Sequence, residues 1–338
     1  MTLYGIADMG FSDSETSSSI AGVSNSASGL KSGNMNSSRW GIKGTEDLGG
    51  GLKANFQLES GIDVANGASS GFTRKAVVGL SGNFGEVKLG RDNNPLYDVI
   101  GTGDVFGMTG IFTSNYLPIG QRVSNMVSYE SPVFGGFSAK AMVGQNKTSS
   151  ETTARVTTDT TSRNTSVSGK YANGPLVVAI GWGENKGAQA ADTATVNSLA
   201  IVMTSADAKQ DGTAISATYD FGVAKLFANY TQGEMSNGVP NEFIKAKETN
   251  LGVSVPLGAF TLLAAYGNND VDVNFGTGAA NINGKGDDFV LGATYDLSKR
   301  TALYARTGTY NKISGNLPTG TSADYKITAT AFGIRHTF

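Results

Sequence analysis

Residues 326–338, the last of the chain, read KITATAFGIRHTF and alternate between two kinds of side chain. One face of this expected strand carries large, mostly apolar side chains, at Phe332, Ile334, His336 and Phe338. The opposite face carries small or polar ones, at Ala331, Gly333, Arg335 and Thr337. Such a strand separates an apolar medium from water, and it ends on an aromatic residue. The pattern is typical of the strand that closes a β-barrel in a bacterial outer membrane, although soluble domains also end on aromatic residues by chance.

The composition favours a barrel over a soluble all-β domain. The chain has 338 residues with 46 Gly, no Cys and one His, and only 39% of the residues are hydrophobic. A soluble domain of this length needs a denser apolar interior, whereas a large barrel has a polar lumen and turns its apolar side chains outward to lipid. We therefore expect residues 1–338 to form one barrel domain.

The chain also lacks the features of several other classes of protein. No run approaches the roughly 20 apolar residues of a membrane-spanning helix. The net charge of −2 argues against nucleic-acid binding. The first residues, MTLYGIADMGF, already alternate as a strand, so we expect the mature form of an exported protein whose signal peptide has been removed.

Short turns and long polar loops alternate along the chain. Seven tight turns are predicted, at residues 46–51, 81–86, 131–136, 173–175, 220–222, 256–258 and 296–300. Eight longer loops are predicted between them, at residues 13–36, 60–70, 92–121, 146–164, 184–211, 233–247, 268–286 and 311–324. Fifteen connections imply sixteen antiparallel strands with short turns at one rim, which is the outer-membrane arrangement. Residues 199–203 could add a further strand.

Alternation within the segments between the turns supports this architecture. After the first turn, one face carries Leu52, Ala54, Phe56 and Leu58, and the other carries Lys53, Asn55, Gln57 and Glu59. A soluble β-sandwich would alternate similarly, but no helical segment is present to cover a second face. Aromatic residues gather near the short turns, as in an interfacial girdle, at Tyr129, Phe137, Tyr171, Tyr219, Phe260, Tyr295 and Phe338.

Several segments resemble the general diffusion porins of β-proteobacteria, which include neisserial-type porins and anion-selective relatives. They are residues 38–48 (SRWGIKGTEDL), 50–56 (GGLKANF), 80–92 (LSGNFGEVKLGRD), 296–304 (DLSKRTALY) and 333–338 (GIRHTF). Val133 stands where the family usually has an acidic residue. The resemblance implies a homotrimeric pore in outer-membrane lipid and lipopolysaccharide, with the third loop folded inward and Phe338 recognised by the barrel-insertion machinery.

The segment 92–121 is expected to be that inward loop on independent grounds. It is too long for a simple hairpin connection. Unlike the Ser/Thr-rich loops, it contains many large apolar side chains, including Leu96, Val99, Ile100, Phe106 and Phe112. Packing against the inner wall would bury them and narrow the pore, whereas a surface cluster or a cap on a neighbouring subunit is the alternative.

Basic side chains are placed in the lumen by alternation. Arg39 and Lys43 share a face opposite Trp40 and Ile42, which suit lipid, and Lys53 faces inward on the next strand. Further basic candidates for the constriction are Arg74, Lys75, Arg122 and Arg91. Relatives of the anion-selective branch place constriction arginines at positions that match Arg39, the Arg74–Lys75 pair and Arg122.

A basic throat would attract anions, and acidic residues of the inward loop would set a transverse field across it. The acidic candidates are Asp98 and Asp104, whereas Arg91 and Asp92 are expected to pair with each other and hold the base of the loop. Solvated or structurally paired charges are the alternative for each of these residues.

No catalytic, metal or cofactor site is expected. The single His336 lies on the lipid-side face of the last strand, away from any Ser or acid partner. We therefore expect a passive, moderately anion-selective channel for small hydrophilic solutes and ions, not an enzyme. A substrate-selective porin for sugars or organic acids, with Tyr304 as a lumen aromatic, and an outer-membrane adhesin are the alternatives. Gly61–Gly71 is expected to contact the neighbouring subunit.

Overall fold

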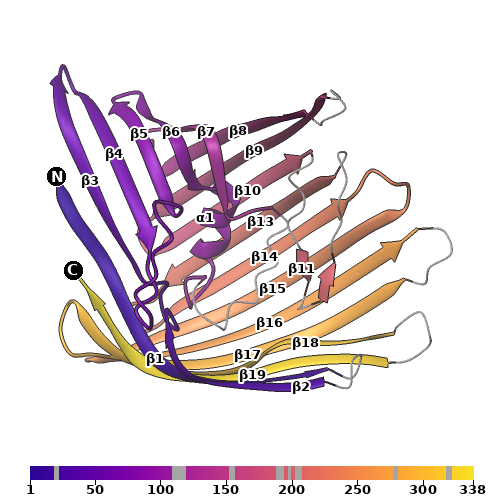
Figure 1. Cartoon of the computed structure of the whole chain (residues 1–338). Coiled ribbons are helices and arrows are strands. Elements are labelled where there is room, and N and C mark those ends of the chain that lie inside the picture. The colour runs from indigo at the N-terminus through magenta and orange to yellow at the C-terminus, as the bar shows by residue number, and fades with distance from the viewer. Residues whose placement is uncertain are drawn as a thin grey trace.

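The computed structural model describes residues 1–18, 23–108, 119–151, 157–187, 194–196, 199–201, 208–276, 281–316 and 322–338. These residues form one antiparallel sheet of 17 strands, which closes because the first strand pairs with the last (Figure 1). Two further short strands, β11 (Ala194–Val196) and β12 (Leu199–Ile201), pair only with each other. Within the described part of the chain, no helix is both long enough and apolar enough to cross a membrane.

The strands of the sheet follow the chain in order around the barrel. The first half comprises β1 (Thr2–Ser18), β2 (Val23–Ser32), β3 (Arg39–Gly49), β4 (Leu52–Gly61), β5 (Lys75–Gly82), β6 (Gly85–Asn93), β7 (Arg122–Glu130), β8 (Phe137–Glu151) and β9 (Thr157–Asn173). The second half comprises β10 (Leu176–Lys186), β13 (Lys209–Asp220), β14 (Lys225–Ser236), β15 (Glu242–Leu257), β16 (Phe260–Phe275), β17 (Ile282–Asp296), β18 (Thr301–Asn316) and β19 (Ser322–Thr337). Among the residues that the structure describes, the one α-helix is α1 (Pro95–Thr102).

The second barrel strand is interrupted, so 17 sheet strands make sixteen barrel positions. Both β2 and β3 pair with β1: residues 23–32 lie beside residues 9–18, and residues 39–43 lie beside residues 2–6. The two segments therefore occupy one position, with residues 33–38 between them. The expected sixteen-stranded antiparallel barrel is confirmed.

All seven short turns lie where the sequence places them, but the loops at the other rim are shorter than expected. The predicted loop 13–36 lies mostly within β1 and β2, and most of 146–164 lies within β8 and β9. Polar Ser, Thr and Asn residues continue the hydrogen-bonded ladder where water solvates both faces, so composition alone did not mark the strand ends. Residues 199–201 are a strand, as considered, but they lie outside the barrel sheet.

The barrel closes through the backbone of the last residue. The Phe338 N–H donates to the Gly5 carbonyl at 3.1 Å, and the Gly5 N–H donates to the Phe338 carbonyl at 3.0 Å. Pairing then continues from Ile6 with Thr337 to Ser18 with Tyr325. As the alternation requires, Phe332 and Ile334 are exposed on the outer face, whereas Ala331 is buried on the inner face.

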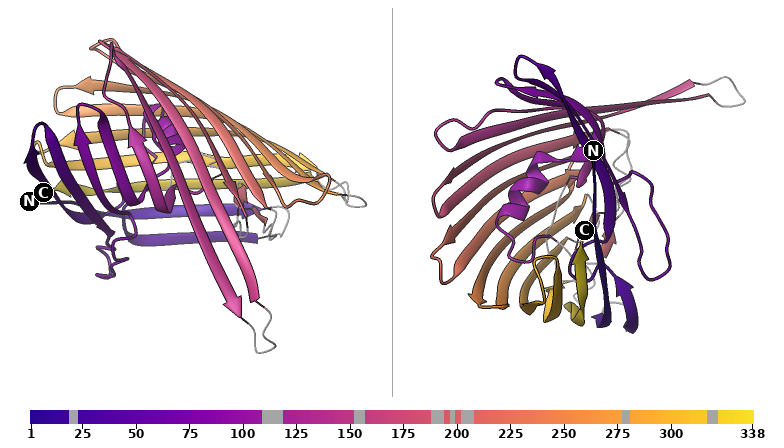
Figure 2. Two further views of the ribbon diagram at one scale, coloured as in Figure 1. Left: turned by 90° about the horizontal axis from the view of Figure 1, so that it is seen from above. Right: turned by 90° about the vertical axis from the view of Figure 1, so that its left-hand side faces the viewer.

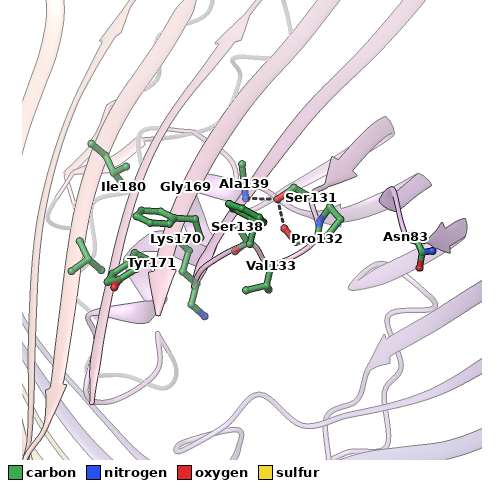
Figure 3. A pocket seen from close by; sticks show the side chains of 13 residues that line it. Asn83, Ser131, Pro132, Val133, Ser138, Ala139, Gly169, Lys170, Tyr171 and Ile180 are labelled. Atoms are coloured by element: carbon green, nitrogen blue, oxygen red, sulfur yellow. Dashed lines mark hydrogen bonds between the residues drawn. The ribbon is translucent and has the colours of Figure 1, made fainter. Parts of the chain in front are cut away.

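The outer wall carries exposed apolar side chains, with aromatic pairs beside the short turns. The Phe137 and Tyr171 rings lie 4.5 Å apart, as do the Phe260 and Tyr295 rings. Beside the turn between β7 and β8, a shallow hollow of about 870 Å³ is bordered by Tyr171, Ile180 and Val133 (Figure 3). Such a surface is suited to lipid rather than water.

The segment between β6 and β7 folds into the barrel, as expected. Figure 2 shows α1 within the ring of strands, where it packs on β10, β13 and their neighbours β9 and β14. Its apolar side chains form a buried cluster with the wall, at Leu96, Val99, Ile100, Ile119, Ala179 and Ala214. The helix starts at Asn94, whose side-chain oxygen accepts from the Leu96 N–H at 2.9 Å and from the Ser166 hydroxyl at 2.6 Å. Phe112, which the sequence also assigned to this packing, lies outside the described residues.

After α1 the loop follows the inner wall, past Ala228 of β14 at Gly103 and past Gly252 of β15 at Val105. Phe106 is 4% exposed and packs with Val290 of β17 and with Ala329 and Ala331 of β19. The loop therefore lines the inner wall from β10, where α1 packs, to β19, where Phe106 packs.

A wall glycine leaves room for α1, and this gives a first prediction. A Cβ on Gly181 of β10 would lie 2.9 Å from the Val99 methyl carbon, which is too close for a real contact. We expect Gly181→Val to displace α1 and to destabilise the barrel by about 1–3 kcal/mol, measured as a lower thermal unfolding midpoint. The matched control is Gly169→Val on β9, where a Cβ meets only the Ile180 side chain at 3.9 Å. Equal stability of the two variants would contradict the packing described for α1.

Candidate functional site

Three of the expected basic residues lie close together on the inner wall, two of them beside one carboxylate. The Arg74 Nε donates to Glu59 Oε1 at 2.8 Å, and the Arg39 Nε lies 3.7 Å from Glu59 Oε2. The Arg122 Nε donates to the Arg74 carbonyl at 3.0 Å. The guanidinium groups of Arg39, Arg74 and Arg122 therefore form one group, which we call the arginine cluster, with Glu59 as its acidic member.

The strand register explains why Glu59 lies at this point. Arg39 is opposite Gly61 on the neighbouring strand, and Glu59 is opposite Lys75 at the start of β5. Diagonal neighbours across a sheet are within reach of long side chains. The cluster thus combines the start of β3, the end of β4 and the residue that precedes β5.

Tyr4 and Gln57 complete the hydrogen bonds of the Glu59 carboxylate. The Tyr4 hydroxyl donates to Glu59 Oε2 at 3.0 Å and accepts from the Gln57 amide at 2.6 Å. A carboxylate held by a guanidinium and a phenol has a fixed orientation. Glu59 therefore stays beside Arg39 and Arg74.

Helix α1 brings Tyr97 toward the arginine cluster. The charges of Arg122 and Arg74 both act on the Tyr97 hydroxyl, as do those of Asp104 and Asp98. Burial, assisted by the two carboxylates and opposed by the two arginines, raises the pKa of Tyr97 above its ordinary value of 10.0. Tyr97 is therefore neutral at physiological pH and leaves the positive charge of the cluster unchanged.

Lys75 and Arg91 each have partners other than those expected. Lys75 Nζ pairs with Asp92 Oδ1 at 2.8 Å, so Asp92 does not pair with Arg91. Arg91 donates instead to the Thr73 carbonyl and to the Ser124 hydroxyl. Arg91 lies opposite Ala76 in the register, which directs it away from the neighbouring Asp92 on an alternating strand.

The two acidic residues of the inward loop are engaged by protein groups. Asp98 accepts from Lys140 of β8 at 2.8 Å. Asp104 accepts from the N–H groups of Phe106 at 2.7 Å and Met108 at 2.8 Å. Asp98 thus attaches α1 to the wall, and Asp104 stabilises the turn that follows the helix.

Lys53 lies apart from the arginine cluster, whereas Lys43 lies beside Tyr4 at its edge. Both are exposed, and the Lys43 ammonium lies 5.4 Å from the centre of the Tyr4 ring. Lys53 is six residues from Glu59 along β4, which corresponds to about 20 Å at 3.3 Å per residue. Lys53 is therefore near the short-turn rim rather than beside the arginines.

Tyr304 does not line the lumen as a sugar-binding surface would. It is 4% exposed, and its hydroxyl donates to Asp8 Oδ1 at 2.7 Å. Alternation along a single strand can place Tyr304 on the inner face of the barrel. It cannot show that Asp8, a side chain of β1, covers the Tyr304 hydroxyl. The burial of Tyr304 gives no support to the sugar-selective alternative, in which it was a candidate lumen aromatic.

The sequence pattern assigned no role in the site to three charged residues of the lumen, Glu59, Lys140 and Arg306. Alternation had placed Glu59 and Lys140 on polar faces, so the signal for their orientation was present. Their partners depend on register and on the path of the inward loop, which the sequence alone did not supply. Among the described residues, no group of three or more His, Cys, Asp or Glu could hold a metal ion.

Comparison with known proteins agrees with this architecture. Residues 1–313 match the family model described as Gram-negative porin. The chain is 34% identical to outer membrane porin protein 32 of Delftia acidovorans, over 100% of this chain and 94% of that protein. It is 28% identical to major outer membrane protein P.IB of Neisseria meningitidis serogroup B, with the same coverage of 100% and 94%.

A solved structure extends the likeness from sequence to fold. The anion-selective porin from Comamonas acidovorans superposes with a TM-score of 0.77 and 31% identity, over 100% of this chain and 99% of that one. The barrel, its inward loop and the sequence matches all indicate the same family. Porins are passive channels, which need no catalytic group. The chain belongs to the Gram-negative porin family and is a passive channel of the outer membrane, not an enzyme.

Proposed function

We propose that this channel passes small hydrophilic solutes and ions with a moderate preference for anions. The observation that supports the proposal is the arginine cluster, in which Arg39 and Arg74 lie beside the carboxylate of Glu59 and Arg122 bonds to the backbone of Arg74. Excess positive charge in a narrow aqueous passage raises the local concentration of anions. The name of the Comamonas acidovorans porin, which describes it as anion-selective, is consistent with the proposal.

We assign smaller contributions to the anion preference to the other basic residues, Lys75, Arg91, Lys43 and Lys53. Lys75 is neutralised by Asp92 at 2.8 Å, and Lys53 is distant from the cluster. Asp98 and Asp104 supply negative charge on the loop side, although both are held by protein partners. The selectivity is therefore assigned mainly to Arg39, Arg74 and Arg122.

The reversal potential of the reconstituted channel under a potassium chloride gradient tests the proposal. We expect the sign that corresponds to greater permeability for chloride than for potassium at neutral pH. A potential of the opposite sign would overturn the anion preference and leave the porin assignment intact. Absence of any conductance would contradict the channel itself.

Glu59→Gln should increase the anion preference, because it removes the one acidic member of the cluster. A unit charge about 7 Å from a monovalent ion in water contributes about 0.6 kcal/mol, which is roughly a threefold change in the local concentration of each ion, in opposite directions for chloride and potassium, before screening by salt. The measurement is the same reversal potential. Glu86→Gln is a control, because Glu86 pairs with Lys88 near a short turn at 2.8 Å. An equal response in both variants would place the selectivity outside the cluster.

We infer in addition that residues 1–338 act as one barrel domain and assemble as a homotrimer in lipid and lipopolysaccharide. The family is typically trimeric, and residues 61–71 form an exposed loop whose turn is held by Asp63. We assign this loop to the contact with a neighbouring subunit and Phe338 to recognition by the insertion machinery. Chemical cross-linking of the purified channel tests the trimer.

A further inference from the structure

A buried tyrosine joins three strands on the inner wall at the place where the barrel closes. Tyr304 of β18 lies opposite Gly333 of β19, and Gly333 lies opposite Gly10 of β1. The Tyr304 hydroxyl reaches past both glycines and donates to Asp8 of β1 at 2.7 Å. Tyr304 is 4% exposed and Asp8 is fully buried. We call Tyr304, Gly333, Gly10 and Asp8 the closure clasp.

The two glycines are required for this path. A Cβ on Gly333 would lie 2.5 Å from the Tyr304 hydroxyl oxygen, and a Cβ on Gly10 would lie 2.6 Å from it. An aromatic ring that covers a glycine on the neighbouring strand also shields the exposed backbone there. The side chain of Tyr304 can therefore cross β19 only because Gly333 and Gly10 have no side chains.

Asp8 extends the clasp to the interruption between β2 and β3. Its second oxygen, Oδ2, accepts from the Met35 N–H at 3.1 Å and from the Asn36 N–H at 2.6 Å. One buried carboxylate thus contacts β18 through Tyr304 and the segment 33–38 through two backbone N–H groups. Such a carboxylate needs all of its partners to offset the cost of burial.

The inward loop is anchored on the same strand, two residues from Tyr304. Arg306 is 3% exposed, and its guanidinium carbon lies 4.9 Å from the centre of the Phe106 ring. The charges of Asp8 and Asp104 both act on Arg306. Arg306 therefore lies between the closure clasp and the part of the loop that contains Phe106.

The same arrangement recurs on the other side of β1. Tyr4 lies opposite Gly41 of β3, which lies opposite Glu59 of β4. A Cβ on Gly41 would lie 2.7 Å from the Tyr4 hydroxyl oxygen, which donates to Glu59 at 3.0 Å. This second clasp ends on the carboxylate of the arginine cluster. The two tyrosines thus join the neighbouring strands β18, β19, β1, β3 and β4. Each tyrosine hydroxyl donates to a carboxylate that lies beside a lumen arginine.

We propose that Tyr304 and Tyr4 are positioning residues that couple closure of the barrel to the geometry of the pore. Each tyrosine reaches its carboxylate only when the intervening strand is paired on both sides. Closure of the barrel then fixes Asp8 beside Arg306 and the inward loop, and it fixes Glu59 beside Arg39 and Arg74. The Tyr304 part depends only on the channel fold, whereas the Tyr4 part rests on the proposed anion preference.

Tyr304→Phe tests the coupling, because it removes the hydroxyl and keeps the ring over the glycines. The purified full-length channel is heated in detergent to measure the rate at which the folded form is lost, and it is reconstituted in bilayers to record open-channel current noise. We expect unfolding about tenfold faster, the factor that loss of one buried hydrogen bond to a charged group implies. We also expect greater current noise, because the inward loop loses its fixed anchor.

Tyr266→Phe is the matched control. Tyr266 lies on the outer face, is about half exposed, and its hydroxyl donates to the Asp287 carboxylate at 3.0 Å. Tyr266→Phe removes a tyrosine–carboxylate hydrogen bond that lies away from the lumen. The rate of unfolding and the current noise should therefore both equal those of the parent channel. If Tyr304→Phe behaves like this control, the clasp is rejected.

The two measurements also separate the parts of the proposal. Faster unfolding with unchanged noise would overturn the coupling to the pore, and greater noise with unchanged unfolding would overturn the role in closure. If Tyr304→Phe gives no folded protein, Asp8→Asn keeps an acceptor oxygen for the tyrosine and is measured in the same way. Tyr4→Phe should change the chloride-to-potassium permeability ratio, and an unchanged ratio would reject the second clasp. A parent channel that prefers cations would refute the anion preference without affecting the unfolding and noise results for Tyr304.

Discussion

Replacing Arg39 and Arg122 together by glutamate is expected to reverse the ion preference of the channel. At about 5 Å in water, a unit charge changes the energy of a monovalent ion by about 0.8 kcal/mol. Each substitution changes the local charge by two units, and salt reduces the sum of the effects. We expect the chloride-to-potassium permeability ratio to fall on the order of tenfold, measured as a change in sign of the reversal potential under a potassium chloride gradient.

The control for this reversal is the pair Lys43→Glu and Lys53→Glu. It makes the same change in net charge at two exposed lysines, and Lys53 is about 20 Å from Glu59 along its strand. We expect a smaller shift that leaves the preference for anions in place. A response as large as that of the arginine pair would mean that the whole lumen, and not the arginine cluster, sets the preference.

Leu96→Ser combined with Ile100→Ser is expected to release α1 from the inner wall. Both side chains are completely buried in the cluster that joins the helix to β10 and β13. Loss of each costs about 2–5 kcal/mol, because apolar contacts disappear and a hydroxyl enters the cluster. The barrel ladder does not depend on these contacts, so the channel should still insert. Its conductance and current noise should both rise in single-channel recordings.

Leu48→Ser combined with Leu297→Ser controls for the change in polarity. These leucines lie beside short turns and are 48% and 54% exposed. The control channel should keep the parent conductance. If the Leu96 and Ile100 variant also kept it, the packing of α1 would not limit the pore.

The sequence predicted the barrel well because its main signals are local. Turn residues and a period of two along each strand depend only on neighbours in the chain, as in the alternation of residues 52–59. The apolar composition of the segment 92–121 likewise predicted that it would leave the water-exposed rim. The same local signals failed at the long loops, since polar residues such as those of 13–18 and 146–151 continue the strand ladder.

The candidate site was predicted less completely because its pairings are not local. Alternation predicted that Arg39 and Glu59 face the lumen, but it gave no reason to place them beside Arg74. The pairing of Asp98 with Lys140 depends on where α1 contacts the wall. The expected pairing of Arg91 with Asp92 was wrong because adjacent residues of a strand point to opposite faces.

The sequence by itself determined the strand order, the short-turn rim, the outward apolar face and the inward loop. These properties follow from periodicity and burial, which each segment carries on its own. Only the tertiary structure decided which charges meet. Tyr304 reaches Asp8 across 296 positions of sequence because the last strands close on the first. The register in which the sheet closes, which no local pattern encodes, sets the partners of Glu59, Arg306 and Asp8.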